Sequence, residues 1–366
     1  MTDTVTCSFF GLGLIGGSLA KTLRERHPQS RILVYDTDPA TLKAVRASGL
    51  ADEVYDSMDS RLCRCDYLFL CAPVAQNLQN LERIAPLLSS DTTISDVGSV
   101  KGPIHRKIQS LKLDGQFIGG HPMTGSERYG FLNSSSALLE NAYYILTPEA
   151  GVPRKKVNDM YELIRSLGAL PFLMDAESHD QTTAAISHLP HLVASGLVHL
   201  VEKQDDAHHT LRTLAAGGFK DITRIASSSP GLWQQICLEN ADFLLEVLAK
   251  YIDHLEEIRQ KLSDRDLDYL YRFFEEAREY RDSFIETKSG PLMKQYVLTL
   301  DIPDKAGALA TVVNLLAREN ISIKNIGILH NREYQEGVLR MEFYHHRDHQ
   351  KAITFLTHHG YTMYPA

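Results

Sequence analysis

A glycine-rich segment near the N-terminus has the residue spacing that binds the pyrophosphate of a dinucleotide. Gly11, Gly13 and Gly16 form a G-x-G-x-x-G pattern directly after the apolar run 5–10 and before a helical pattern at 17–26. The first glycine permits a tight turn, the second lets the backbone approach the phosphates, and the third lets the helix pack closely on the strand. The N–H groups at the start of the helix then face the anion.

An acidic residue at the end of the next predicted strand indicates which dinucleotide is bound. Asp36 follows Gly16 by twenty residues, the spacing at which a carboxylate meets the ribose 2′-hydroxyl. The carboxylate would repel a 2′-phosphate, and residues 37–39 supply no arginine to receive one. The sequence therefore favours NAD over NADP, with cofactor contacts predicted at Gly11, Leu12, Gly13, Leu14, Ile15, Gly16 and Asp36.

Two later segments, 96–101 and 119–127, end predicted strands in the way that active-site loops do. Ligands of open α/β sheets bind at the carboxyl ends of strands, so we expect His121 in a glycine-flanked loop beside the nicotinamide. An imidazole there can take a proton from a substrate hydroxyl while hydride leaves the same carbon. A loop histidine that only bonds backbone is the alternative.

Two further segments carry histidines or cations at helical spacing. His188 and His191 are three apart and share one face, but no acid stands at H-E-x-x-H spacing. We therefore predict packing or substrate contact there, and no metal site. Lys220 and Arg224 are four apart, which places both cations on one helix face, ready for a carboxylate-rich substrate. A solvated basic face is the alternative.

The elements that must hold these residues follow three successive patterns. Residues 1–174 alternate apolar runs with helical patterns, which predicts an α/β, Rossmann-type doubly wound sheet. Residues 175–289 show helical periodicity, with an apolar stripe from Leu255 to Phe273 that we interpret as a subunit interface. Residues 294–366 have the order βαββαβ of a ferredoxin-like unit. Strands of the first domain are expected at 5–10, 31–35, 67–71, 92–95, 116–118 and 143–146.

The composition is that of a globular protein of two or three domains. The chain has 366 residues, of which 43% are hydrophobic and 23% charged, with a net charge of -8. It shows no basic block for nucleic acid, no apolar run near the roughly 20 residues of a membrane span, and no signal-type N-terminus. The five cysteines form no C-x-x-C pair. We therefore expect a cytoplasmic protein that binds neither nucleic acid nor membrane.

Six segments in order resemble the prephenate dehydrogenase family of tyrosine biosynthesis: GLGLIGGSLA, DVGSVK, GGHPMTGSE, HDQTTAAISHLPH, GGFKDITRIA and the downstream Trp233. The resemblance implies an NAD-dependent oxidative decarboxylation of prephenate to 4-hydroxyphenylpyruvate by a homodimer with an all-helical dimerisation domain. It implies that His121 is the catalytic histidine and that Ser99 helps to place it. The substrate contacts that it implies are Ser126, Glu127, His191, Lys220, Arg224 and Trp233.

The C-terminal segment resembles an ACT domain, a module that binds an amino-acid effector in many enzymes. L-tyrosine, the end product, is the expected inhibitor. The effector contacts expected are Asp301, Gly307, Ala308, Leu309, Asn325 and Ile326. Three alternatives stay open: an arogenate or dual-specificity cyclohexadienyl dehydrogenase, a β-hydroxyacid dehydrogenase with a lysine base on its helical domain, and an NAD-sensing regulator without catalysis.

Overall fold

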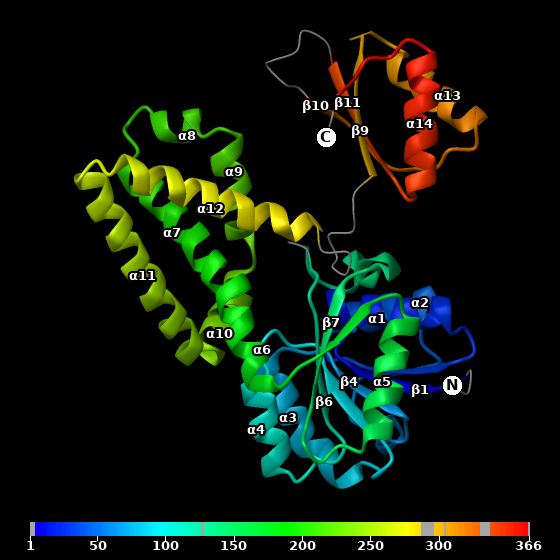
Figure 1. Ribbon diagram of the computed structural model, residues 1–366. Helices are drawn as coiled ribbons and strands as arrows, with labels where there is room; N and C mark the ends of the chain where they lie inside the picture. Colours follow the sequence, from blue (N-terminus) through cyan, green and yellow to red (C-terminus); the bar gives the residue numbers. More distant parts are fainter. Residues whose placement is uncertain (1–3, 126–127, 287–295, 304, 330–336, 365–366) are drawn as a thin grey trace. The chain divides into compact units, whose positions relative to one another are not determined.

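The computed structural model describes residues 4–125, 128–286, 296–303, 305–329 and 337–364 (Figure 1). Its internal contacts divide the chain into two compact units, Met1–Asp266 and Leu267–Ala366. The first unit contains the sheet domain and most of the helical domain that the sequence predicts. The three-domain boundaries at 174/175 and 289/294 stay a prediction.

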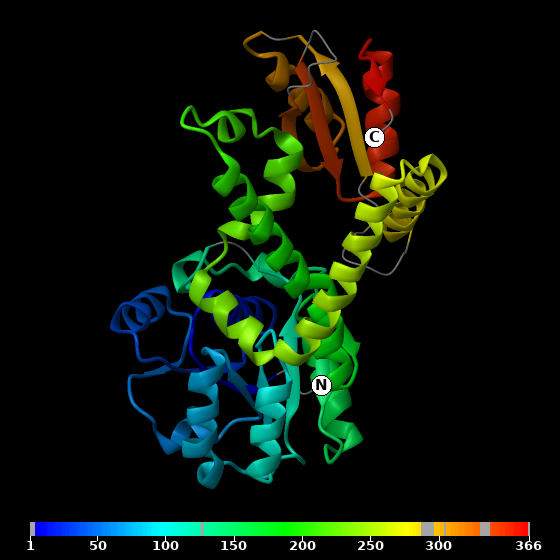
Figure 2. The ribbon, with the colours of Figure 1, turned by 90° about the vertical axis from the view of Figure 1, so that its left-hand side faces the viewer.

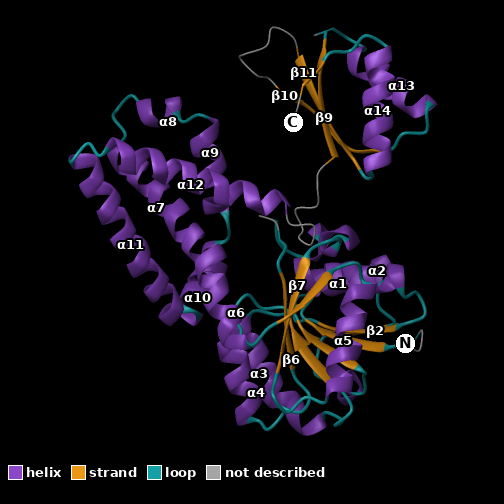
Figure 3. Ribbon diagram, in the orientation of Figure 1, coloured by secondary structure: helices purple, strands orange, loops and turns teal. Residues whose placement is uncertain are grey.

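A mostly parallel sheet forms the centre of the first unit (Figure 3). Five parallel strands have the order β3-β2-β1-β4-β5, and a parallel bridge between Ile94 and Phe117 connects β5 to a second group, β6-β7-β8. Within that group β6 is antiparallel to β7, which is parallel to β8. The strands are β1 (Thr6–Phe10), β2 (Arg31–Tyr35), β3 (Glu53–Tyr55), β4 (Tyr67–Leu70), β5 (Thr93–Asp96), β6 (Ile118–Pro122), β7 (Tyr143–Pro148) and β8 (Leu170–Leu173).

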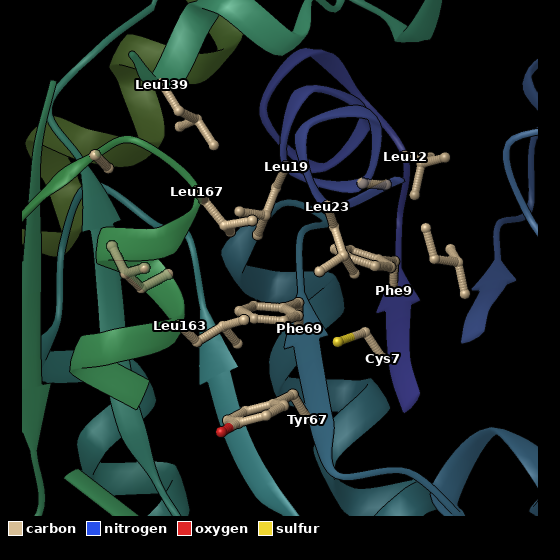
Figure 4. Packing of buried hydrophobic residues seen from close by; sticks show 14 of the residues in the cluster. Cys7, Phe9, Leu12, Leu19, Leu23, Tyr67, Phe69, Leu139, Leu163 and Leu167 are labelled. Atoms are coloured by element: carbon tan, nitrogen blue, oxygen red, sulfur yellow. The ribbon is translucent and has the colours of Figure 1, made fainter. Parts of the chain in front are cut away.

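Helices cover both faces of this sheet because its central strands are apolar on both faces. On one face α1 (Leu14–Arg26), α2 (Pro39–Ser48) and α5 (Arg154–Ser166) contribute to a core that includes the stacked rings of Phe9 and Phe69 (Figure 4). On the other face α3 (Val74–Ile84) and α4 (Gly102–Ser110) enclose a second core. Short 3-10 turns occupy Ser60–Cys63, Ala85–Leu87, Phe131–Asn133, Ser136–Leu139 and Arg224–Ser227.

The predicted Rossmann-type order of elements is confirmed, with one consequential difference at β6. The sequence pattern places a strand at 116–118 and a loop after it, whereas β6 runs from Ile118 to Pro122 and includes His121. The cause lies in Gly119 and Gly120. A Cβ atom on Gly120 would lie 2.5 Å from the backbone oxygen of Asp96, so these glycines mark close strand packing and not a loop.

The helical part of the first unit begins with one long helix. It comprises α6 (Ala176–Thr183), a π-helical turn (Ala184–His188) and α7 (Leu189–Gln204). By length and composition it is the one helix among the described residues that is apolar enough to cross a membrane. The remaining helices are α8 (Thr210–Leu214), α9 (Gly217–Thr223), α10 (Pro230–Glu239) and α11 (Ala241–Ser263). Helix α11, yellow-green in Figure 2, contacts α6, the π-helical turn and α7.

The apolar stripe predicted from Leu255 to Phe273 does not lie on one helix. Helix α11 ends at Ser263 and α12 (Leu267–Glu286) begins three residues after Asp264, past Arg265, whose φ is +53°. A residue with positive φ interrupts a right-handed helix. The expectation of a single continuous stripe is therefore wrong.

The second unit continues from α12 into a small sheet with two helices. Its elements are β9 (Tyr296–Ile302), α13 (Ala308–Arg318), β10 (Ile323–Leu329), β11 (Gly337–Phe343), α14 (His346–His358) and β12 (Met363–Tyr364). The sheet is antiparallel, with the order β10-β11-β9-β12. The order of elements agrees with the predicted βαββαβ pattern.

Candidate active site

His121 is held by the pairing of β6 with β7, where it stands opposite Ile145. Its imidazole is the first member of a hydrogen-bonded chain. Nδ1 of His121 lies 2.8 Å from Nε2 of His179, and Nδ1 of His179 lies 2.8 Å from Oδ1 of Asp180. His179 is fully buried and Asp180 nearly so, and both belong to α6. The chain therefore connects the sheet to the helical domain.

The carboxylate of Asp180 also accepts hydrogen bonds from backbone N–H groups at the start of α4. Its Oδ1 accepts from the N–H of Lys101 and its Oδ2 from the N–H of Gly102, each at 2.7 Å. Burial acts to raise the pKa of Asp180, but the hydrogen bonds from His179 and from these two backbone groups outweigh it and leave the pKa lowered. Asp180 is therefore ionised at neutral pH.

An ionised carboxylate can only accept hydrogen bonds, so Asp180 determines where the protons of the chain lie. His179 must donate from Nδ1, which leaves its Nε2 to accept from Nδ1–H of His121. Nε2 of His121 then carries a lone pair. Burial, aided by His179 and Lys101, lowers the pKa of His121 well below its ordinary value, so the ring is neutral at neutral pH. These are the properties of a general base.

The ring of His121 lines a cavity of about 440 Å³ in the first unit. The loop after β5 contributes Ser99, helix α7 contributes His191, and the turn after α9 contributes Arg224. Trp233 of α10 completes this set. The structure thus brings together these five residues, which the sequence predicts to act on the substrate.

Aromatic stacking defines one wall of the cavity. The rings of Trp233 and His191 have centroids 3.5 Å apart and planes 20° apart, and Trp233 meets the edge of His188 at 5.9 Å. Burial, with a contribution from Arg224, lowers the pKa of His191 to about 4. His191 therefore contributes hydrogen bonding and ring contact near neutral pH, and the cations that line the described part of the cavity are Arg128 and Arg224.

Lys220 does not join Arg224 in this cavity. Helix α9 ends at Thr223 and Arg224 begins a 3-10 turn, so the spacing of four no longer places both cations on one helix face. Lys220 is exposed and lines a separate cavity with Arg212 and Glu202. The predicted substrate contacts Ser126 and Glu127 lie outside the described residues.

Lys101 is a fully buried cation beside the base. Its Nζ donates to Oδ2 of Asp96 at 2.5 Å and to the backbone oxygen of Gly120 at 2.6 Å. The ion pair thereby fixes the end of β5 to the strand that carries His121. Burial lowers the pKa of Lys101, and the partner Asp96 opposes this shift.

The loop after β1 has the geometry predicted for a dinucleotide site. Gly11 has φ of +88°, and a Cβ on it would lie 2.7 Å from the backbone nitrogen of Ala72. A Cβ on Gly16 would lie 2.7 Å from that of Cys71, whereas one on Gly13 would meet nothing within 4 Å. The open side at Gly13 is where the backbone can approach phosphates.

Asp36 is fixed against this loop by two backbone hydrogen bonds. Its Oδ2 accepts from the N–H of Leu12 at 2.7 Å and its Oδ1 from the N–H of Asp38 at 2.9 Å. Helix α1 begins at Leu14 without a side-chain cap, so its first N–H groups are available to an anion. These residues fit the pyrophosphate and ribose of NAD.

Sequence reasoning missed His179, Asp180 and Lys101 as members of the site. His179 and Asp180 lie in the second turn of the long helix 176–204, where a polar pair has no distinctive spacing. Only the folded contact with His121 gives them a role. Lys101 stands two residues after Ser99 in a segment that the sequence does single out. The signal in the sequence that could have identified Lys101 is its position after a predicted buried strand.

The fold and the site together define an NAD-dependent oxidoreductase with a Rossmann-type domain and a helical second domain. Residues 19–171 match the family model described as prephenate dehydrogenase, nucleotide-binding domain. Residues 175–276 match the model described as prephenate dehydrogenase, dimerization domain. The chain belongs to the prephenate dehydrogenase family.

Individual relatives agree with this assignment. The chain is 37% identical over 354 residues to prephenate dehydrogenase of Bacillus subtilis, covering 96% of this chain and 95% of the relative. It is 34% identical to cyclohexadienyl dehydrogenase of Zymomonas mobilis, covering 77% of this chain and 96% of the relative. A crystal structure of prephenate dehydrogenase from A. aeolicus with hydroxyphenyl propionate and NAD+ has a TM-score of 0.72 and 30% identity, covering 76% of this chain and 98% of that one.

Proposed function

We propose that the cavity beside His121 oxidatively decarboxylates prephenate to 4-hydroxyphenylpyruvate. The observation that carries this proposal is the chain from Asp180 through His179, which leaves Nε2 of His121 as an acceptor. An acceptor there suits the ring hydroxyl of prephenate. Arg224, which lines the same cavity, suits a substrate carboxylate.

The overall reaction balances without releasing a proton, so the base needs no pathway that carries a proton to solvent. NAD, when bound, accepts the hydride that leaves C4 of the ring. The bond from C1 to its carboxylate breaks, carbon dioxide leaves, and the electron pair of that bond completes the aromatic ring. His121 accepts the hydroxyl proton and returns it to the same oxygen, which becomes the phenol. The overall reaction therefore releases no proton to solvent.

The residues of the chain contribute position and electrostatics to this step. His179 and Asp180 hold the imidazole in the tautomer that accepts at Nε2. Ser99 lines the same cavity as His121. Its hydroxyl suits a role in positioning the base and the nicotinamide. Trp233 and His191 give the ring of the substrate a flat wall.

Arogenate is the second candidate substrate, because it differs from prephenate only in an amine where prephenate has a keto group. NADH formation, followed with each substrate in parallel at equal enzyme, tests the proposal. We expect kcat/KM for prephenate to be the larger. Turnover of arogenate alone would contradict the proposal.

The β-hydroxyacid class has less support, because no lysine is among the described residues that line the cavity. Lys101 is fully buried and paired, and Lys220 lines a different cavity.

We also propose that two copies form a homodimer through their helical domains, in the cytoplasm. Leu238, Leu245 and Leu262 are each more than half exposed, and only 17% of the apolar stretch of the helix 176–204 is buried within the chain. A second copy would cover such apolar surface. Sedimentation equilibrium tests this, and a monomer at micromolar concentration would contradict it.

We further propose that the C-terminal βαββαβ unit is an ACT domain that binds L-tyrosine. Gly307, with φ of +87°, precedes α13, which begins without a side-chain cap. The N–H of Ala308 donates to the backbone oxygen of Lys305 at 3.2 Å, so the N–H of Leu309 is the first of α13 that can receive a carboxylate. Asp301 lies near the end of β9, the strand that precedes this turn.

The other two predicted effector contacts lie elsewhere on the same sheet. Ile326 is paired with Met341 of β11, which is paired with Leu298 of β9. Asp301 of β9 is paired with Val338, three residues before Met341 in β11. Three residues of strand correspond to about 10 Å. This separation within one module is what motivates placing the ligand between two paired modules, where one copy supplies the turn at Gly307 and the other supplies Asn325 and Ile326.

A further inference from the structure

A second histidine of the cavity, His188, has no role in the mechanism above. It ends the π-helical turn, is 1% exposed, and its ring lines the same cavity as that of His121. π-Helical turns are rare in proteins, and those that do occur are often found at functional sites. What His188 can offer a substrate depends on which ring nitrogen carries the proton.

Asn240 determines the position of that proton. Its Nδ2 donates to the backbone oxygen of Asp180 at 2.8 Å and lies 3.0 Å from Nδ1 of His188. A carbonyl oxygen can only accept, so the amide nitrogen must face it, and the orientation of the buried Asn240 is fixed. The second N–H of the amide then points at His188, whose Nδ1 must accept. The proton of a neutral His188 is therefore on Nε2.

His188 is neutral because its surroundings disfavour a charge. Burial lowers the pKa of His188 to about 4; nearby Asp180 acts against this shift, and His179 and His191 add to it. Nε2–H has no hydrogen-bond partner within the described part of the chain. His121 and His188 thus face one cavity with opposite polarity, one as acceptor and the other as donor. Asp180 sets both, through its carboxylate for His121 and through its backbone oxygen for His188.

The position of His188 indicates which part of the substrate it meets. The ring of His188 has its centroid 5.9 Å from that of Trp233, which stacks on His191, and these three residues line the cavity together with His121 and Arg224. A substrate with its hydroxyl at His121 and its side-chain carboxylate at Arg224 carries the keto oxygen next to that carboxylate. The keto oxygen can only accept a hydrogen bond, whereas the ammonium of an amino acid at the same carbon can only donate.

We propose that Nε2–H of His188 donates a hydrogen bond to the keto oxygen of the substrate side chain, and that Asn240 is the positioning residue that makes His188 a donor. The inference rests on the proposed function. It identifies the pair of His188 and Asn240 as a device that favours a keto acid over the corresponding amino acid.

Two ligands that differ only at the keto group test the contact. 4-Hydroxyphenylpyruvate has the keto oxygen and 3-(4-hydroxyphenyl)propionate lacks it, and the Kd of each for the NAD-loaded dimer is measured by isothermal titration calorimetry. His188→Asn places its amide at the position of Nδ1 and removes the donor at Nε2, whereas His188→Gln places an amide nitrogen near Nε2. We expect His188→Asn to weaken the keto ligand about 3- to 10-fold, the usual range for one neutral hydrogen bond, with less than a 2-fold change for the other ligand. His188→Gln should restore most of the difference.

Equal loss for both ligands in His188→Asn would overturn the keto contact and make the role of His188 one of packing. The role of Asn240 has a separate readout in the nitrogen-15 NMR spectrum of histidine-labelled enzyme. We expect an unprotonated Nδ1 for His188 in the wild type and a protonated Nδ1 in Asn240→Asp. An unprotonated Nε2 in the wild type would overturn the tautomer assignment. Both measurements are independent of turnover, so failure of the wild type to oxidise prephenate would count against the proposed function alone.

Discussion

Nδ1 of His121 lies 2.8 Å from Nε2 of His179, so the base shares a hydrogen bond with a second, fully buried imidazole. Two neutral imidazoles can form this bond in only two ways, and Asp180 selects one of them because it must accept from His179. The lone pair of His121 is consequently presented to the cavity. A helix of the second domain thereby determines the chemistry of a residue on the sheet.

Replacement of His121 by Asn removes the acceptor at Nε2. We expect kcat to fall by roughly 10² to 10⁴, the usual contribution of a positioned general base. His121 lies in β6, but its ring faces the cavity, so the Tm and the affinity for NAD should change little. A variant that retains most of the wild-type kcat at neutral pH would assign the base to another residue, with His191 the next candidate.

Replacement of His179 by Leu tests the positioning of the base without touching the substrate. Nδ1–H of His121 then loses its acceptor, and the ring can place its proton on Nε2, where it blocks acceptance from the hydroxyl. We expect kcat to fall by roughly 10-fold to 100-fold with KM for prephenate little changed, by analogy with the loss of the hydrogen-bond partner that orients a metal-ligating histidine.

His179→Gln is the matched control, because its amide oxygen can accept from Nδ1–H of His121. It should recover part of the lost kcat. If His179→Leu and His179→Gln lose the same activity, the loss reflects packing and not the tautomer.

The pH dependence of the reaction follows from the lowered pKa of His121. The ring must be neutral to act, and burial keeps it neutral below the ordinary imidazole pKa of 6.5. We therefore expect kcat/KM for prephenate to stay level as the pH falls through 6.5 and to decline only at more acidic pH. An acidic limb centred at or above 6.5 would show that the base is an ordinary exposed histidine.

The free energy of unfolding, unlike kcat/KM, should change over this pH range, and its measurement is the necessary control. His121, His179, His188 and His191 all have lowered pKa values in the folded chain, so the unfolded chain binds more protons below pH 6.5. The free energy of unfolding, and with it the Tm, should therefore decrease as the pH falls below 6.5. Rates are to be compared only where the enzyme stays folded.

The sequence predicts the local geometry of the glycine loop more completely than the surroundings of His121. A glycine turn and an acid are local features, and their spacing is set by one strand, one helix and the next strand. The glycines beside His121 single it out in the sequence, but by themselves they indicate a loop. Their close packing against Asp96 is a long-range contact that the local sequence does not show. His179 has meaning only through a contact that spans 58 residues. Such contacts leave no periodicity in the sequence.

Arg224 and Lys220 form a matched pair for testing charge in the cavity. We expect Arg224→Ala to raise KM for prephenate about 10- to 100-fold, because a hydrogen bond to a charged group contributes about 1.5–3 kcal/mol. Lys220→Ala should leave KM within about 2-fold, since Lys220 lines a different cavity. The affinity for NAD should not respond to either change. A large effect of Lys220→Ala would place that residue in the active site of the assembled dimer.

If the C-terminal unit binds L-tyrosine, a substitution on its sheet should weaken feedback inhibition. Asn325 is exposed on β10, so its replacement by Ala removes a predicted effector contact without opening the core. We expect this variant to need at least about 10-fold more tyrosine for half-inhibition, with kcat unchanged, because a carboxylate or ammonium contact of an effector contributes in that range. Lys351→Ala, an exposed change on α14, is the control and should keep the wild-type response.

A chain that ends after α12 separates regulation from product-like competition. We expect the truncated enzyme to oxidise prephenate and to resist tyrosine. Tyrosine resembles the product in its phenol and carboxylate, so it can also occupy the cavity between His121 and Arg224. Undiminished inhibition in both Asn325→Ala and the truncated enzyme would place its effect there and remove the regulatory role from the C-terminal unit.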